Sequence, residues 1–182
     1  MKEKIELYKD FVRPHYSTRD VAHNFDHIER IIRRIEILSN GVSPSPQRER
    51  LSFLACFHGL GARLRDDESF RQQMIAFLEN LGWKDAEIQE LFRSLERHLE
   101  SPETVEEEIV HDANKVEIPG AFGVAKAFTM GALLGQPYEE TVDCFEHKAL
   151  GRVVFRTPLG KQLAEEGRAY ALEFLKRLRC EL

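Results

Sequence analysis

Apolar residues repeat at helical intervals along most of the chain, and strand-like alternation is almost absent. One stripe of a long helix is predicted by apolar residues spaced four, three, four and three positions apart, namely Val21, Phe25, Ile28, Ile32 and Ile35. The Asn40-Gly41 pair should end this helix, because both residues suit the left-handed conformation that is typical of helix C-termini.

Three Ser-Pro or Thr-Pro pairs predict further helix starts, since the first residue can cap the helix and proline suits its first turn. They are Ser45-Pro46, Ser101-Pro102 and Thr157-Pro158. Other helices are expected over residues 68–81, 85–99, 119–134 and 138–150. The connections are short, and neither a repeat nor a low-complexity linker divides the chain. We therefore predict one all-α domain over residues 1–182, a bundle of roughly seven to nine helices.

Length and composition suit a globular domain. A chain of 182 residues, 42% of them hydrophobic, can bury a core without disulfides or a structural metal. The 26 basic and 31 acidic residues give a formal charge of -5, without long blocks of one sign. Binding to nucleic acid or to a membrane surface needs a concentrated positive face, so neither partner is expected.

The spacing of the cysteines and the N-terminal residues indicate the cellular compartment. Cys56, Cys144 and Cys180 lie far apart and form no CxxC pair, which disfavours a thiolate zinc site and a disulfide framework. The charged N-terminal residues do not resemble a signal peptide, and no apolar run approaches the ~18 residues of a membrane span. We expect a soluble cytoplasmic protein with reduced thiols.

The informative positions are polar residues that interrupt the apolar stripes. His58 follows Leu51, Leu54 and Ala55 at helical spacing, so an imidazole should face the core. Asp112 is aligned with Ile109 and Val116, and a buried carboxylate calls for a cation or dense hydrogen bonding. His23 and His27 are four residues apart, so we expect them to share a helix face at the edge of a stripe.

Each of these residues also has a purely structural explanation. His58 could be a hydrogen-bonded core histidine, and Asp112 could cap a neighbouring helix or pair with an arginine. The His23–His27 pair could be a solvated surface feature. Together, however, two histidines and an aspartate from three helices form a recognised ligand set for a divalent cation.

Three segments containing these residues resemble the HD superfamily of metal-dependent phosphohydrolases. They are HNFDHIERI (residues 23–31), ACFHGLGARL (residues 55–64) and VHDANKVE (residues 110–117), in the family's order. The C-terminal stretch over residues 140–178 resembles the tail of the small bacterial members. The resemblance implies a helical bundle in which His27, His58 and Asp112 bind metal.

The sequence departs from the family pattern at two positions. Gly59 stands where the name-giving His-Asp doublet has its aspartate, and Asn114 replaces the second acid of a DAD-like segment. In the family the doublet aspartate binds metal and bridges both ions of two-metal members. Its replacement disfavours a dinuclear site, although Gly59 and Gly61 together also make a good helix terminus.

The remaining ligands suit one weakly held Mn²⁺, Fe²⁺, Co²⁺, Ni²⁺ or Zn²⁺ ion, whereas Mg²⁺ prefers all-oxygen surroundings. The resemblance places His23 and His98 beside the cavity, as catalytic residues or as packing and positioning residues. Fixed cations near the metal could hold substrate phosphates, with Arg63 and Arg65 alternatively part of a solvated loop. These candidate substrate-binding residues are Arg30, Arg63, Arg65 and Lys115.

Three functions fit these residues. The first is a hydrolase acting on a nucleotide-like or other small phosphate ester or anhydride. The second is a catalytically inactive HD protein that binds a nucleotide or metal as a sensor or partner domain, as the changes at Gly59 and Asn114 would allow. The third is an HD-fold oxygenase, which normally needs the intact doublet and two irons. The sequence leaves open whether the chain acts as a monomer or a homodimer.

Overall fold

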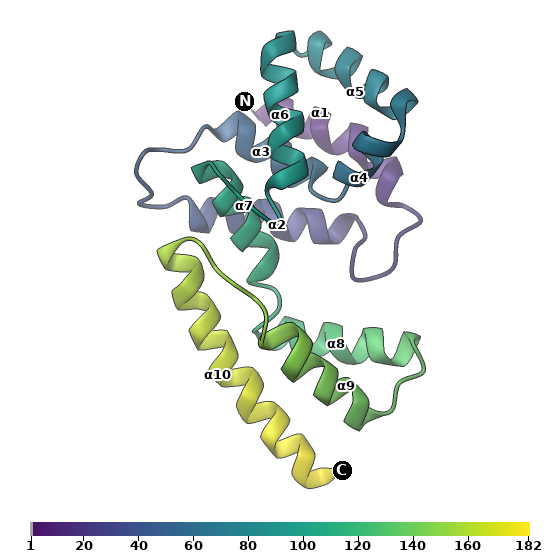
Figure 1. The fold of residues 1–182 in the computed structure, drawn as a ribbon, viewed down its shortest axis with the longest axis vertical. Helices are drawn as coiled ribbons and strands as arrows, with labels where there is room; N and C mark the ends of the chain where they lie inside the picture. Colours follow the sequence, from purple (N-terminus) through teal and green to yellow (C-terminus); the bar gives the residue numbers. More distant parts are fainter. Residues whose placement is uncertain (1) are drawn as a thin grey trace. The chain divides into compact units, whose positions relative to one another are not determined.

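The computed structural model describes residues 2–182, which form ten α-helices, one 3-10 helix and one π-helical segment, without a β-strand (Figure 1). The all-α class predicted from the apolar periodicity is confirmed. The helix count exceeds the prediction because α1 (Lys2–Val12) and α4 (Gly61–Asp66) were not among the expected helices. The chain divides into two compact units, one ending at His111 and one running from Asp112 to Leu182, with the division inside α7 (Val105–Lys115).

The first unit is organised around α3. This helix packs against α1, α2 and α6 (Figure 1), and its residues 53–57 are all buried. A short helix with five consecutive buried residues must be covered on every side, which three neighbouring helices achieve. The elements of the unit, in chain order, are α1 (Lys2–Val12), the 3-10 helix η1 (Arg13–Tyr16), α2 (Phe25–Leu38), α3 (Arg48–Phe57), α4 (Gly61–Asp66), α5 (Glu68–Asn80), α6 (Asp85–Arg97) and the first part of α7.

Aromatic side chains fix α3 against its neighbours. Phe53 and Phe57 stack one turn apart with ring centroids 4.6 Å apart, and Tyr8 of α1 lies edge-on to Phe57 at 5.8 Å. The Tyr8 hydroxyl accepts a 2.9 Å hydrogen bond from the indole of Trp83, so its polar end is satisfied inside the core. Each such ring pair stabilises the fold by roughly 0.5–1.5 kcal/mol beyond the free energy gained by burying its surface. They hold the end of α3 rigidly, and His58 follows that end.

The second unit contains the rest of α7, then α8 (Ala121–Leu133), α9 (Tyr138–Cys144), the π-helical segment η2 (Phe145–Leu150) and α10 (Pro158–Glu181). Helix α8 packs against both α9 and α10. Their shared core is a cluster of buried apolar residues: Val124, Val142, Phe145, Leu150, Ala171 and Leu175. As predicted, Thr157 caps α10, and its hydroxyl accepts the Gly160 N–H at 3.0 Å.

Two predicted helix boundaries at the start of α2 and at its end had different outcomes. Gly41 has a φ of +72°, which confirms the predicted left-handed end. At the other end the prediction was wrong, because Asn24 caps the helix through the Asp26 N–H and α2 begins at Phe25. Val21 therefore lies in a turn with 60% of its surface exposed, and His23 precedes the helix.

Two of the Ser-Pro pairs are not helix starts. Helix α3 begins at Arg48, where the N–H of the preceding Gln47 donates a 2.6 Å hydrogen bond to Glu106. Helix α7 begins at Val105, after Thr104, whose hydroxyl accepts the Glu107 N–H at 3.3 Å. In both places a polar partner other than the serine satisfies the first backbone donors.

The three cysteines are free thiols. Cys56 is buried in α3, and burial raises its pKa to about 12, so this thiol stays protonated and unreactive. Within residues 2–182, none of the helices combines the length and the hydropathy that crossing a bilayer requires.

Candidate functional site

Three buried histidines form a row in the first unit. His27 lies in the first turns of α2, His58 follows the end of α3, and His98 follows the end of α6. The ring centroids of His27 and His58 are 5.5 Å apart, and those of His58 and His98 are 5.1 Å apart. The helical spacing predicted the inward orientation of His58, and its 8% exposure confirms that prediction.

Hydrogen bonds set the protonation pattern of this row. His98 Nδ1 lies 2.8 Å from the Leu95 carbonyl oxygen, which can only accept, so Nδ1 carries the proton. Burial lowers the pKa of His98 to about 4, so the ring is neutral at pH 7 and its Nε2 is an acceptor. His58 Nδ1, 2.9 Å from that atom, must then donate. This bond places the ring proton of His58 on Nδ1.

A buried ion pair holds the end of α6, where His98 lies. Arg97 donates to the fully buried Glu107 of α7 through Nη2 at 2.8 Å and through Nε at 2.9 Å. Burial alone would raise the pKa of Glu107, but the hydrogen bonds from Arg97 and the Glu103 N–H lower it overall. Glu107 is therefore ionised, and the fork-shaped contact fixes the residue immediately before His98.

His23 stands at the exposed end of the histidine row. Its ring centroid is 6.3 Å from that of His27, and its Nδ1 lies 2.9 Å from both carboxylate oxygens of Asp20. This hydrogen bond lowers the pKa of Asp20. The prediction that His23 and His27 share a helix face was wrong, since His23 precedes α2, but the turn still brings the two rings close together.

Asp112 lies at the start of the second unit with none of its surface exposed. Its Oδ2 accepts hydrogen bonds from the Thr157 hydroxyl and N–H, both at 2.7 Å, and its Oδ1 accepts the Arg156 N–H at 3.0 Å. Gly160 leaves room for this carboxylate, which a β-carbon at that position would overlap. The dense hydrogen bonding expected for a buried aspartate is therefore present, and it joins α7 to the start of α10.

The candidate phosphate-binding residues come from three helices, α2, α4 and α7. Arg63 lies on α4, where Nη1 is 2.8 Å from His15 Nδ1 and Nε donates to Asp67 at 3.2 Å. Arg65 is on the same helix, exposed and paired with Asp66 at 2.9 Å. These two residues are thus in a helix and not in a solvated loop. Two others are half-buried, Arg30 in α2 and Lys115 at the end of α7.

His111 is a fourth buried histidine that the sequence analysis missed. It is 4% exposed, it lies one turn after Glu107 in α7, and its charge contributes to lowering the pKa of His98. Its place one residue before Asp112 was visible in the sequence, but the apolar stripe used to find inward-facing residues passes through Asp112. Helix α7 is buried around most of its circumference, so a single stripe underestimates its inward-facing side chains.

His27 and His58 are the pair of side chains in this row that could bind a metal ion. Imidazole nitrogens are ligands of divalent transition metals, and the 5.5 Å separation of the His27 and His58 rings is compatible with one shared ion. Within residues 2–182, no group of three or more His, Cys, Asp or Glu side chains is arranged to hold a metal ion. The pair therefore fits such an ion as two ligands, and Asp112 as a third stays a prediction.

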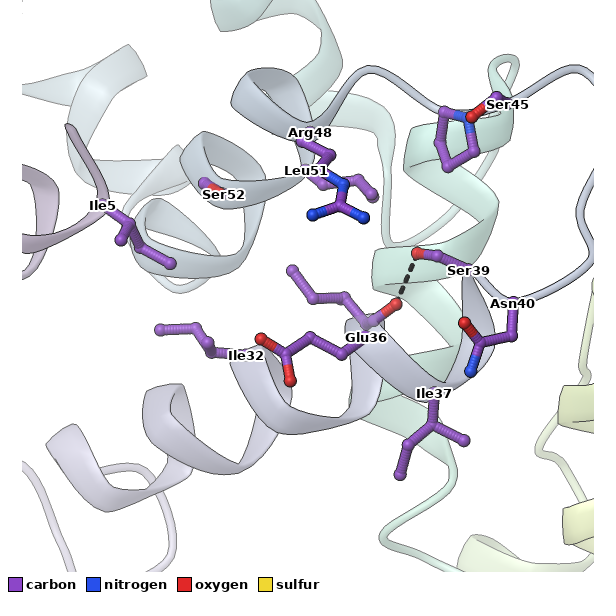
Figure 2. A pocket seen from close by; sticks show the side chains of 12 residues that line it. Ile5, Ile32, Glu36, Ile37, Ser39, Asn40, Ser45, Arg48, Leu51 and Ser52 are labelled. Atoms are coloured by element: carbon purple, nitrogen blue, oxygen red, sulfur yellow. Dashed lines mark hydrogen bonds between the residues drawn. The ribbon is translucent and has the colours of Figure 1, made fainter. Parts of the chain in front are cut away.

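A groove of about 670 Å³ lies elsewhere in the first unit. Figure 2 shows it between the C-terminal half of α2 and the start of α3, with Ile5 of α1 at one end. Glu36 and Arg48 extend into it from opposite sides. None of the predicted site residues is among the twelve that line it, so the groove is separate from the histidine row.

The whole chain is similar to several solved structures. An HD-superfamily hydrolase from Bacillus thuringiensis is 23% identical, with a TM-score of 0.79 over 99% of this chain and 97% of that one. The Lin1889 protein from Listeria innocua is 22% identical, with a TM-score of 0.78 over 98% and 94%. Bacillus subtilis YpgQ, in complex with ADP, is 18% identical, with a TM-score of 0.79 over 100% and 96%. No protein-family model and no curated protein matches the chain.

These similarities define the fold class. The chain has the all-helical fold of the HD-superfamily hydrolase from Bacillus thuringiensis, as the resemblance of residues 23–31, 55–64 and 110–117 predicted. At these identities the comparison establishes the fold, and the chemistry must be argued from the residues of this chain.

Proposed function

We propose that this chain is a metal-dependent phosphohydrolase acting on a nucleotide-like or other small phosphate ester or anhydride through a single, weakly held metal ion. The proposal rests above all on the buried row His27–His58–His98, in which the rings of His27 and His58 lie 5.5 Å apart and hydrogen bonds place the ring proton of His58 on Nδ1. The similarity to an HD-superfamily hydrolase supports the reaction class, and the ADP complex of YpgQ supports a nucleotide as substrate.

Two imidazoles, from His27 and His58, would hold the ion, with the Asp112 carboxylate as the expected third ligand. A divalent transition metal, when bound, polarises a phosphoryl oxygen and lowers the pKa of bound water. His98 acts as a positioning residue, because its acceptor nitrogen keeps the proton of His58 on Nδ1.

His23 is the candidate for proton transfer. Its side chain is half exposed, and Asp20 holds the proton on Nδ1, so Nε2 of the neutral ring can accept a proton. This position near His27 and open to solvent suits a group that exchanges protons with water. Protonated His23 could equally contact a phosphate oxygen.

A second candidate is a protein that binds a nucleotide without hydrolysing it. The observation that favours it is the surroundings of residue 59, where a β-carbon would come within 2.5 Å of Arg19 Nη1. The positive guanidinium of Arg19 next to the histidine row repels a metal cation. In the family, a carboxylate that attracts the metal occupies this place.

A phosphate-release screen separates the two candidates. Nucleotides and phosphomonoesters are incubated with Mn²⁺, Co²⁺, Ni²⁺ or Mg²⁺, using the parent, His58→Ala and the control His147→Ala, which removes an exposed histidine of η2. We expect release with a transition metal that falls about 100-fold or more in His58→Ala and is unchanged in His147→Ala. Absence of release from every substrate, with nucleotide binding retained, would favour the second candidate.

A further inference from the structure

Arg19 is bound against the backbone of Gly59. Its Nη2 donates a 2.7 Å hydrogen bond to the Gly59 carbonyl oxygen, and its guanidinium carbon lies 4.5 Å from the centroid of the Tyr16 ring. The Tyr16 hydroxyl accepts the Gly59 N–H at 3.1 Å and donates to the Cys56 carbonyl at 3.3 Å. Tyr16 and the end of α3 therefore fix the plane of the guanidinium group.

The absence of a side chain at residue 59 makes this arrangement possible. A β-carbon there would lie 2.5 Å from Arg19 Nη1, closer than non-bonded atoms approach. Gly59 does not have a positive φ, so its backbone conformation does not require glycine. The close approach of Arg19 is the feature of this site that favours glycine.

The charge of Arg19 is not neutralised within residues 2–182, where no carboxylate forms an ion pair with it. Arg63 and Arg65, by contrast, pair with Asp67 and Asp66. Arg19 is also half-buried, so water compensates its charge less than that of a fully exposed arginine. A guanidinium has five N–H donors, and the bond to Gly59 uses one of them.

The histidine row begins beside this charge. Gly59 directly follows His58, and the turn after Arg19 leads through Asp20 to His23. A fixed, planar and unneutralised guanidinium next to imidazole groups is suited to the oxygens of a phosphate, which accept parallel N–H donors.

We propose that Arg19 binds the phosphate group of the substrate, and that Gly59 is needed to admit its side chain. This assignment rests on the proposed site beside His58, and it adds a residue that the sequence analysis did not select. In this arrangement the guanidinium of Arg19, beside residue 59, contacts the anionic substrate directly, where a carboxylate at residue 59 would have held a second metal.

The test is phosphate binding without metal. Inorganic phosphate and ADP are titrated calorimetrically, in chelator, into the parent, Arg19→Gln and the control Arg13→Gln. Arg13 also stacks on an aromatic ring, at 4.0 Å from the Phe25 centroid, but is exposed. We expect both probes to bind Arg19→Gln at least about ten-fold more weakly than the parent, and Arg13→Gln within about two-fold. A preference of the parent for ADP over inorganic phosphate would identify the phosphate as part of a nucleotide.

Equal affinity of Arg19→Gln and the parent, or no binding of either probe to the parent, would overturn the assignment. Should Arg19→Gln lose helicity, the parent itself is modified with an arginine-specific dicarbonyl reagent, and phosphate should protect Arg19 but not Arg65. Unprotected Arg19 would also refute the proposal. If Arg19-dependent binding is found without metal-dependent hydrolysis, only the proposed enzymatic function fails. If hydrolysis is found and phosphate affinity is unchanged in Arg19→Gln, only this inference fails.

Discussion

Asp112 Oδ2 lies 2.7 Å from the hydroxyl oxygen of Thr157, the residue that caps α10. The same carboxylate accepts backbone N–H groups from residues 156 and 157, so one buried negative charge satisfies the donors at the start of the longest helix of the second unit. A negative group is favourable at a helix N-terminus. Asp112 is therefore a structural residue in the metal-free protein, whether or not it also binds metal.

We expect Asp112→Asn to lower the free energy of unfolding by about 2–3 kcal/mol in metal-free buffer, because its amide nitrogen must face a donor that the carboxylate oxygen accepted. Urea unfolding followed by circular dichroism measures this. The control is Asp143→Asn, which removes an exposed carboxylate paired with Arg179 and should change stability by less than about 0.5 kcal/mol. A loss in Asp112→Asn no larger than in the control would show that these hydrogen bonds contribute little.

Substitution of His98 should weaken metal binding through His58. In His98→Leu the acceptor for His58 Nδ1–H is lost, so the ring is no longer held in the tautomer with its lone pair on Nε2. We expect Mn²⁺ or Co²⁺ affinity to fall about 10–100-fold in His98→Leu. His98→Gln offers an amide oxygen in a similar place and should recover most of that loss. Calorimetric titration compares the three proteins, and similar weakening by both substitutions would contradict the tautomer argument.

The free energy of unfolding should decrease as the pH is lowered below the ordinary range of histidine titration. Burial lowers the pKa of His98 from 6.5 to about 4, so the unfolded chain takes up a proton below pH 6.5 that the folded protein does not. This contribution is fully present above pH 6.5 and is lost as the pH falls toward 4, by about 3 kcal/mol in total. Urea unfolding at intervals between pH 7 and 4.5 should show a flatter profile for His98→Gln. Parallel profiles would mean that another group titrates.

The sequence predicted those parts of the fold that depend on neighbouring residues. Local spacing was sufficient for the stripe that ends at His58, for the turn at Gly41 and for the cap at Thr157. Helix α7 shows the limit of the Ser-Pro rule. Thr104 and Glu107 form the local cap there, with Glu107 also accepting the Glu103 N–H at 2.8 Å.

Features set by distant residues could not be predicted. The start of α3 depends on a bond from Gln47 to Glu106, 59 positions away, and the contact of Arg19 with Gly59 spans 40 positions. Gly59 itself was noticed in the sequence as a departure from the family pattern. Its contact with Arg19 could not be predicted, because a glycine that makes room for a distant side chain has the same local sequence pattern as a glycine that ends a helix.

Gly59→Asp tests how the Arg19 charge and a metal compete. The backbone at residue 59 accepts an L-residue, but the new β-carbon displaces Arg19 Nη1, which is the far end of a flexible side chain. The introduced carboxylate can then pair with the displaced guanidinium instead of a metal. We therefore expect Gly59→Asp alone to raise Co²⁺ or Mn²⁺ affinity by less than about three-fold.

Removing the competing cation should reveal the effect of the carboxylate. In Gly59→Asp combined with Arg19→Ala, metal affinity should exceed that of Arg19→Ala alone by about ten-fold or more, because a second anionic ligand then stands next to His58 without a counter-charge. Gly59→Ala is the control for the β-carbon, and it should displace Arg19 without any gain in metal affinity. The four variants and the parent are compared by calorimetry after their helicity has been checked. If Gly59→Asp alone binds metal as tightly as the double variant, Arg19 does not oppose a cation at this position, and the glycine must have another reason.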